Sequence, residues 1–238
     1  MRIIIPTCDR YRNILEANKY TMDKFGGADM DVTVLGFKQP DFDMGNWKFV
    51  SLGTDTGAKN FSNDLMKFFI DFDDEYFIYA HDDVVITNTI NTTFLNEIIE
   101  TIKEVPNFGK IWLLKAPPDF YGVSSTVKDF GTYKIDEIRQ QAEYRLSLQT
   151  SIWKTNYFKR YLQPNLSPWD WELRSNAKND GANILIPNGN HVIGVGHVMK
   201  QGHLIPNWFT PVFNTKLELT NEDIEIIGNI LRKHGYSL

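Results

Sequence analysis

Two adjacent carboxylates and an imidazole interrupt an apolar stretch of the chain. Residues 76–86 read YFIYAHDDVVI, which places His81, Asp82 and Asp83 between two runs with the character of buried strand. A carboxylate is costly in such surroundings unless a cation compensates its charge. Two of them point to a divalent cation, because hard oxygen ligands suit Mg²⁺ and Mn²⁺. The alternative is that Asp82 and Asp83 only cap a turn at the end of the strand.

The apolar residues that follow the two carboxylates favour the cation. Val84-Val85-Ile86 predicts that the chain continues as sheet after the carboxylates. Asp82 and Asp83 would then lie within a buried framework and not at the tip of a loose turn. A divalent cation is therefore the working hypothesis for this segment.

Alternating strands and helices are predicted for the first half of the chain. The predicted strands cover residues 2–5, 31–36, 47–52, 76–80 and 110–114, and the predicted helices cover 10–25, 60–72 and 91–105. Asp9 and Asn91 are expected to cap two of these helices. The alternation predicts an α/β fold with a mixed, mainly parallel sheet flanked by helices. Such sheets bind ligands at the carboxyl ends of their strands, where the loops 7–10 and 81–83 fall.

The second half of the chain is less regular. The predicted strands cover residues 145–153, 182–187 and 191–195, and the predicted helices cover 155–162, Ser167 to near Gly181, and a final amphipathic stretch from Thr220. No internal repeat or low-complexity linker separates the two halves. We therefore expect a single domain over residues 1–238.

Composition excludes several classes of protein. The 238 residues are 42% hydrophobic and 23% charged and carry a net charge of −5, which argues against a nucleic-acid partner bound through phosphate neutralisation. No apolar run reaches the roughly 18 residues of a transmembrane helix, and the apolar start is too short for a signal peptide. Cys8 is the only cysteine, so a reducing, cytoplasmic location is expected.

The loop after the first strand offers an anion site at the start of a helix. Residues 3–10 read IIIPTCDR, which predicts a strand, a sharp turn, a polar loop and the first helical residues. Free N–H groups and positive potential at a helix N-terminus favour an anion there. The chain has neither a GxGxxG nor a GxxxxGK[ST] motif, which speaks against a dinucleotide enzyme and a P-loop NTPase. An ordinary strand-to-helix turn explains the same residues.

Four segments of the chain resemble GT-A glycosyltransferases, which bind a nucleotide-sugar. IIIPTCDRY resembles their IPTYNR-type start, and YFIYAHDDVVI resembles the strand before their DxD-type metal motif. GAKNFSNDLMKFFIDFDDEYFIYAHDD is similar to a bacterial and phage-type pattern of this family, and SLQTSIWKTNYFKRYLQPNLSPWDWELR is similar to its acceptor-side segment. The resemblance covers roughly residues 1–36, 55–90 and 145–205, in the family's order. It departs at His81, where the family usually has an acid.

The resemblance implies a fold and a reaction. A GT-A-like, Rossmann-like domain would have residues 1–115 as its nucleotide-sugar-binding half and residues 116–238 as its acceptor-side half. It would move a sugar from a nucleotide-sugar, with a UDP-sugar favoured, to an acceptor hydroxyl. Mn²⁺ or Mg²⁺, with Mn²⁺ favoured, would lie on the diphosphate. The resemblance implies no oligomeric state.

The resemblance also suggests roles for single residues. Asp83 would bind the cation, and Asp82 would contact the ribose or a water molecule. His81 and His197 would be further metal ligands, although each could equally be a bystander in its loop. The remaining donor-side candidates are Thr7, Asp9, Arg10, Lys59 and Trp169.

The motif SPWDWE has both a structural and a catalytic interpretation. Ser167 and Asp170 have the spacing of a capping box with Pro168 at the first helical position, so Asp170 has a structural explanation. In an inverting transferase, a carboxylate at this place would deprotonate the acceptor hydroxyl. Asp170 and Glu172 point in different directions on a helix, so only one of them can be the base. Asp170 is the first candidate and Glu172 the second.

Two other functions remain as alternatives. A sugar nucleotidyltransferase would use the same acidic pair, but it should carry a glycine-rich basic loop after the first strand. The loop Thr7-Cys8-Asp9-Arg10 has no glycine, which counts against this function. A non-catalytic carbohydrate-binding protein would use the aromatic residues but would not need the acidic end of the strand.

Overall fold

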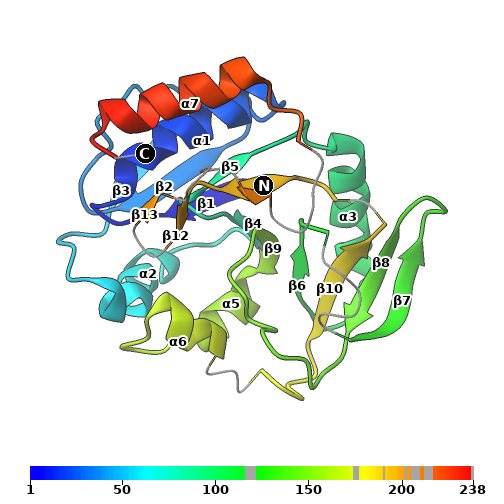
Figure 1. Cartoon of the computed structure of the whole chain (residues 1–238). Coiled ribbons are helices and arrows are strands. Elements are labelled where there is room, and N and C mark those ends of the chain that lie inside the picture. The colour runs from blue at the N-terminus through cyan, green and yellow to red at the C-terminus, as the bar shows by residue number, and fades with distance from the viewer. Residues whose placement is uncertain are drawn as a thin grey trace. The chain divides into compact units, whose positions relative to one another are not determined.

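The chain folds into two compact units, each assembled from separate stretches of sequence. The computed structural model describes residues 1–115, 122–173, 177–189, 191–200, 203–204, 210–211 and 217–236 (Figure 1). The first unit contains Met1–Ile4, Thr56–Ala80 and Asn91–Val192. The second unit contains Ile5–Asp55, His81–Ile90 and Ile193–Leu238.

The sheet of the first unit is mixed. Its strand order is β1-β4-β9-β6-β10-β8-β7, where β4 is parallel to β1 and β10 is parallel to β6. Strand β9 runs antiparallel between β4 and β6, and β7 and β8 form an antiparallel hairpin at the edge. The strands are β1 (Arg2–Pro6), β4 (Tyr76–Tyr79), β6 (Phe108–Trp112), β7 (Val123–Asp129), β8 (Lys134–Ile138), β9 (Ser151–Lys154) and β10 (Asn183–Asn188).

Aromatic side chains hold the helices of the first unit against this sheet. Phe158 is fully buried, and its ring centroid lies 5.1 Å from that of Phe77, 4.8 Å from that of Phe69 and 4.9 Å from that of Trp171. Tilted and edge-to-face pairs at these distances add to the gain from apolar burial. The helices are η2 (Ala58–Asn60), α2 (Phe61–Phe69), α3 (Thr92–Glu104), α5 (Thr155–Tyr161) and α6 (Pro168–Leu173).

The second unit combines parallel and antiparallel strand pairs with two main helices. Strand β2 (Val32–Gly36) runs parallel to β3 (Lys48–Ser51). A separate three-stranded antiparallel sheet has the order β14-β11-β5. The other elements are η1 (Arg12–Ile14), α1 (Leu15–Lys24), β5 (Val84–Ile86), β11 (Val195–His197), β12 (Met199–Lys200), β13 (His203–Leu204), β14 (Thr210–Pro211) and α7 (Asn221–Lys233).

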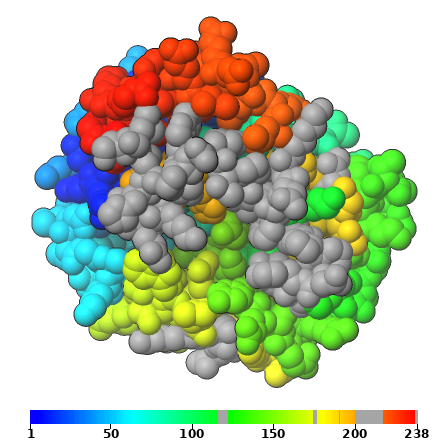
Figure 2. Space-filling view, viewed as in Figure 1, coloured from blue at the N-terminus to red at the C-terminus, as the bar shows by residue number. Residues whose placement is uncertain are grey.

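Helices α1 and α7 lie side by side in the second unit (Figure 1). The outer side of α7 is at the surface, in orange and red in Figure 2, and its inner side is apolar. The buried residues between the two helices and the small sheet are Ile14, Ala17, Val85, Val198, Met199, Ile227 and Leu231. This core fixes β5, and therefore the end of the acidic segment, against α1.

The predicted α/β class is confirmed. Both units combine strands with helices, as the alternating pattern predicted. The predicted cap at Asn91 is also confirmed, since Asn91 accepts a hydrogen bond from the Phe94 N–H. The final helix, predicted to start from Thr220, begins there with a capping box. No described helix is both long and apolar enough to cross a membrane.

Several sequence-based predictions were wrong in detail. The Asp9 side chain does not cap the first helix, because its Oδ1 accepts a hydrogen bond from the Lys38 N–H at 3.1 Å. Of the predicted strand 145–153, only residues 151–153 are strand, and β9 continues to Lys154. The hairpin β7–β8 was not predicted, and β5 belongs to the small sheet. Helix α6 ends at Leu173, and residues 174–176 of its predicted continuation lie outside the described residues.

Asp223 joins α7 to α1 and is almost completely buried. Its Oδ2 accepts hydrogen bonds from the N–H and hydroxyl of Thr220, both at 2.7 Å. Its Oδ1 accepts from the Tyr20 hydroxyl at 2.6 Å and from the Lys24 amine at 2.5 Å. Burial alone would raise the pKa of Asp223, but these donors lower it far below its usual value.

We predict that Asp223→Asn costs about 1.5–3 kcal/mol of stability near pH 7, the range for hydrogen bonds to a charged group. A lowered folded-state pKa stabilises the fold above the unfolded-state pKa near 4, and this stabilisation is lost as the pH falls towards the folded-state value. Urea unfolding should therefore show a smaller penalty at about pH 2.5 than near pH 7. Glu222→Gln, at the exposed neighbouring carboxylate, is the control. An equal penalty at both pH values would contradict the prediction.

Candidate functional site

Helix α1 holds the acidic segment in place. The Asn18 side chain donates a hydrogen bond to the Asp82 carbonyl at 2.9 Å. The Thr21 hydroxyl accepts one from the Ile86 N–H at 3.1 Å and lies close enough to donate to the Ala17 carbonyl. Asn18 and Thr21 are both buried, so these bonds are shielded from water. Polar residues on the inner face of α1 therefore set the position of residues 82–86.

The small sheet brings a histidine to Asp83. In the ladder between β5 and β11, Val84 is opposite His197, and the Val198 N–H donates to the Asp83 carbonyl at 3.0 Å. The His197 Nδ1 lies 3.8 Å from the Asp83 Oδ2, and both side chains are partly exposed. The Asp83 Oδ1 is buried and has no hydrogen-bond partner among the described residues. Such an oxygen calls for an explanation such as an ion. This one belongs to the acidic segment, unlike the oxygens that are also buried without a partner among the described residues at Glu97 and Gln149.

Gly194 is what allows β11 to approach β5. The Gly194 N–H donates to the Asn88 Oδ1 at 2.7 Å, and the Thr87 N–H donates to the Gly194 carbonyl at 2.9 Å. A Cβ atom on Gly194 would come within 2.6 Å of the Asn88 Oδ1 and 2.8 Å of the Thr87 Oγ1. A side chain at position 194 would therefore clash with Thr87 and Asn88 in this close approach.

Asp82 faces the loop after β1. Its carboxylate interacts with the Thr7 side chain and with the Cys8 N–H. Burial and the neighbouring charge of Asp83 raise the pKa of Asp82 to about 7, although these hydrogen bonds act in the opposite direction. The Thr7 N–H donates to the Leu35 carbonyl at 2.8 Å, which ties the loop to β2. The structure thus places four of the predicted site residues, Thr7, Asp82, Asp83 and His197, in the second unit, with Asp82 beside Thr7 and Asp83 beside His197.

The other donor-side candidates have different surroundings. The Asp9 N–H donates to the Asp55 carboxylate at 3.1 Å, and the Asp9 carboxylate pairs with Lys38 at 3.3 Å. Asp9 therefore links the loop after β1 to the loop after β2. Arg10 is exposed, and Lys59 lies exposed on η2 in the first unit. The contacts of Asp9, Arg10 and Lys59 with a nucleotide-sugar stay predictions.

The residues around Asp83 fit a hard divalent cation. Mg²⁺ is usually held by one or two carboxylates together with substrate phosphates and water, and not by a complete protein cage. No cluster of three or more His, Cys, Asp or Glu side chains suited to a metal occurs in the described part of the chain, so His81, Asp83 and His197 do not form one. The buried Asp83 Oδ1 supplies a hard ligand, and His197 supplies a nitrogen that Mn²⁺ accepts.

The acceptor-side candidates lie in the first unit, on and around α6. The Asp170 Oδ2 accepts hydrogen bonds from the Ser167 hydroxyl at 2.8 Å and from its N–H at 3.2 Å, while the Asp170 N–H donates to the Ser167 Oγ at 3.1 Å. This is the predicted capping box. Trp171 is 1% exposed and packs in the core, whereas Trp169 is 62% exposed. Only Trp169 of this pair can contact a ligand.

Glu172 holds the segment before β9. Its Oε1 accepts a hydrogen bond from the Leu148 N–H at 2.7 Å and from the Ser147 hydroxyl at 3.2 Å. The Trp171 Nε1 donates to the Leu146 carbonyl at 3.1 Å. Trp171 and Glu172 of α6 therefore hold residues 146–148, the segment before β9, in place.

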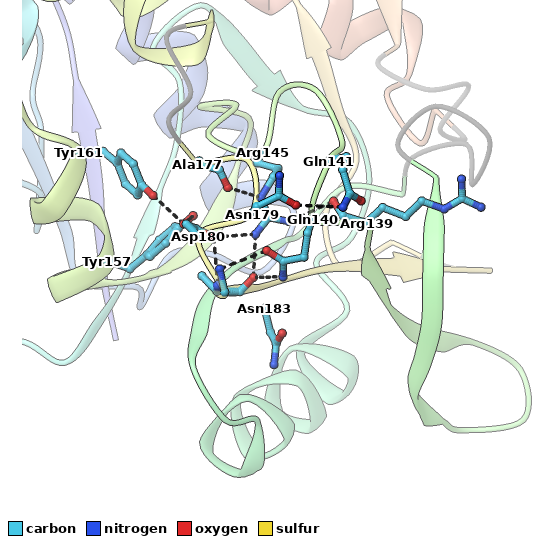
Figure 3. A network of polar contacts seen from close by, with 12 residues as sticks. Arg139, Gln140, Gln141, Arg145, Tyr157, Tyr161, Ala177, Asn179, Asp180 and Asn183 are labelled. Atoms are coloured by element: carbon cyan, nitrogen blue, oxygen red, sulfur yellow. Dashed lines mark hydrogen bonds and ion pairs between the residues drawn. The ribbon is translucent and has the colours of Figure 1, made fainter.

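Arg145 anchors the same segment through a network that the sequence did not predict (Figure 3). Its guanidinium is fully buried and donates to the carbonyls of Arg139, Ala177 and Ala182 at 3.1, 2.9 and 2.7 Å. It also lies 3.1 Å from the Asp180 carboxylate. The one signal in the sequence is an arginine that begins the apolar alternation RLSL. A buried guanidinium needs this number of acceptors.

Asp180 connects the network to α5. Its Oδ2 accepts hydrogen bonds from the Tyr157 hydroxyl at 2.9 Å and the Tyr161 hydroxyl at 2.6 Å (Figure 3). Burial would raise the pKa of Asp180, but these hydroxyls, the Ala182 N–H and the Arg145 charge lower it. The carboxylate is therefore held in its charged form, and the chain that follows α6 is tied to α5.

Comparisons with known proteins support the fold. Neither the protein-family models nor the curated proteins give a match. The crystal structure of S. aureus TarS 1-349 is similar, with a TM-score of 0.51 and 14% identity over 81% of this chain. This chain spans 59% of the length of TarS 1-349. The likeness confirms the predicted GT-A fold and shows the fold alone.

Two further solved structures are more distant. The mannosyltransferase PcManGT from Pyrobaculum calidifontis, in complex with GDP-Man and Mn²⁺, has a TM-score of 0.47 and 13% identity, and the match covers 84% of this chain and 57% of that one. The galactosyltransferase LgtC, in complex with donor and acceptor sugar analogs, has a TM-score of 0.40 and 11% identity, and the match covers 67% of this chain and 60% of that one. At these scores, neither structure bears on the function of this chain.

We predict that Thr21→Val costs about 1–3 kcal/mol of stability, because it leaves the buried Ile86 N–H without its acceptor. Thr21→Ser keeps the hydroxyl and is the matched control, with a smaller loss. Urea unfolding of both variants measures the difference. Equal losses for Val and Ser would show that the hydroxyl does not hold β5 against α1.

Proposed function

We propose that the protein transfers a sugar from a nucleotide-sugar to an acceptor hydroxyl, with a divalent cation on the donor diphosphate. The observation that carries the proposal is the buried Asp83 Oδ1, which has no partner among the described residues while His197 lies beside the other oxygen. The GT-A fold supports the proposal at the level of architecture. A UDP-sugar is the favoured donor.

Asp83 and His197 would hold the cation, Mn²⁺ before Mg²⁺, and His81 is a further candidate ligand. The cation, when bound, would stabilise the negative charge that develops on the leaving diphosphate. Asp82, fixed against the loop that carries Thr7, would contact the ribose or a water molecule. Asp9, Arg10, Lys59 and Trp169 remain proposed donor contacts.

A carboxylate of α6 would deprotonate the acceptor hydroxyl, which makes the proposed transfer inverting. Asp170 is the first candidate, and its Oδ2 is committed to the capping box. Glu172 is the second, and its Oε1 is committed to Ser147 and Leu148. Glu172 would therefore use its other oxygen as the base. NMR analysis of the anomer in the product distinguishes inversion from retention.

We predict that the protein turns over at least one donor from a panel of UDP-, GDP- and CMP-sugars with Mn²⁺, and that EDTA stops this turnover. Hydrolysis to the nucleotide diphosphate or monophosphate is measured by chromatography, and donor binding is measured by thermal shift. The absence of both turnover and a donor-induced thermal shift would contradict the transferase proposal. Release of pyrophosphate from a nucleoside triphosphate and a sugar phosphate would instead indicate a nucleotidyltransferase.

We predict that Asp83→Asn lowers the Mn²⁺-dependent turnover by more than about 100-fold, because even outer partners of metal ligands are worth about 10–100-fold. Asp29→Asn, at an exposed carboxylate of the same unit, is the matched control. Isothermal titration with Mn²⁺ provides a second readout without turnover. Unchanged activity and unchanged Mn²⁺ affinity in Asp83→Asn would refute the ligand assignment.

We predict that one of Asp170→Asn and Glu172→Gln lowers transfer to the acceptor by about 10²–10⁴-fold, the usual contribution of a general base. Hydrolysis of the donor in the same samples corrects for damage to donor binding. Ser167→Ala removes the capping hydroxyl but neither carboxylate, and it is the control for loss of the capping box. Full transfer activity in both carboxylate variants would exclude α6 as the source of the base.

A further inference from the structure

A lysine is buried in the centre of the sheet of the first unit. Lys110 lies in the middle of β6, between β9 and β10, and is 0% exposed. It is opposite Trp153 in the ladder, so both side chains emerge on the same face of the sheet. The amine lies 4.6 Å from the Trp153 ring centroid and 4.9 Å from that of Trp112. Two indole faces therefore cage the amine.

An apolar residue would be cheaper to bury at this position. A buried charge generally stabilises a fold no better than a well-packed apolar side chain of similar volume. Burial lowers the pKa of Lys110 well below its usual value, while the charge of Glu172 acts in the opposite direction. Packing alone therefore does not explain why a lysine occupies this position. The hydrogen bond of its amine to the Ser147 carbonyl does.

The amine of Lys110 donates a hydrogen bond to the Ser147 carbonyl. On the same residue, the Ser147 hydroxyl donates to the Glu172 Oε1 at 3.2 Å, and the Leu148 N–H donates to that oxygen at 2.7 Å. Lys110 thus fixes the peptide that presents two donors to Glu172. Both donors reach the same oxygen, the Glu172 Oε1, and so hold the carboxylate on one side.

We propose that Lys110 is a positioning residue, which acts through Ser147 to set the orientation of the Glu172 carboxylate on α6. This inference rests on the proposed function in assigning Glu172 to the acceptor side. Lys110 touches neither donor nor acceptor in this scheme. Its removal should therefore reduce transfer to an acceptor more than hydrolysis of the donor.

Lys110→Met tests the inference, because methionine has a side chain of similar length and removes the hydrogen-bond donor to the Ser147 carbonyl. The ratio of transfer to hydrolysis is measured with the active donor of the panel and with p-nitrophenyl glycosides of glucose, galactose and N-acetylglucosamine as acceptors. We expect the ratio to fall by about 10–100-fold, the effect of a small misplacement of a reacting group. Ile111→Val is the matched control, since its side chain emerges on the opposite face of β6.

Hydrogen exchange of the Leu148 amide gives a readout that needs no activity. The hydrogen bond from the Leu148 N–H to Glu172 should open more easily in Lys110→Met. The Leu148 amide should then exchange about tenfold faster than in Ile111→Val at matched global stability. Ser147→Ala removes the other donor to the same oxygen and should change the transfer ratio in the same direction. This second variant keeps the test valid if Lys110→Met fails to fold.

The outcomes separate this inference from the proposed function. A transfer ratio that is unchanged in Lys110→Met, or that falls equally in Ile111→Val, overturns the positioning role. If no donor or acceptor of the panel reacts with the wild-type protein, the exchange of the Leu148 amide decides alone. Faster exchange confined to Lys110→Met and Ser147→Ala then supports the inference, and unchanged exchange overturns it.

Discussion

A polar group that leaves water needs a partner, and this requirement shapes both units of the protein. In the second unit, Asp223 collects donors from α1 and α7 and so joins the two helices. In the first unit, the guanidinium of Arg145 is satisfied by three carbonyls and the Asp180 carboxylate. Asp83 differs from them, because its Oδ1 is buried without a partner among the described residues. Buried oxygens without a hydrogen-bond partner among the described residues also occur at Glu97 and Gln149, and it is the neighbouring His197 that makes the Asp83 Oδ1 a candidate ligand.

The aromatic core explains why α6 carries one buried and one exposed tryptophan. Phe158 and Trp153 pack against Trp171, which fixes the rotation of this short helix. Trp169, two residues earlier, must then point outwards, as its 62% exposure shows. The same rotation turns Glu172 towards Ser147 and Leu148, so that apolar packing decides which polar groups of α6 hold the segment before β9 and which are presented to solvent.

The GT-A architecture does not by itself establish a reaction, since one fold hosts many activities. The proposal of sugar transfer rests instead on the chemistry of particular side chains. A hard oxygen at Asp83 and a nitrogen at His197 suit Mn²⁺, and the loop with Thr7 lies against Asp82. These features are independent of the low identity to TarS 1-349. Lys110 extends the same reasoning to the acceptor side, where a costly buried amine is explained by the peptide that it fixes.

The sequence alone determined the α/β class, most helices of the first half, the cap at Asn91, the final helix from Thr220, and the acidic segment as the place to look for chemistry. These features follow from local periodicity and side-chain chemistry, which neighbouring residues encode. Only the tertiary structure decided that His197 meets Asp83, because β11 pairs with β5, and that Arg145 and Lys110 are buried. These pairings join residues more than 30 positions apart in the chain, and no local pattern records which distant partner satisfies a buried charge.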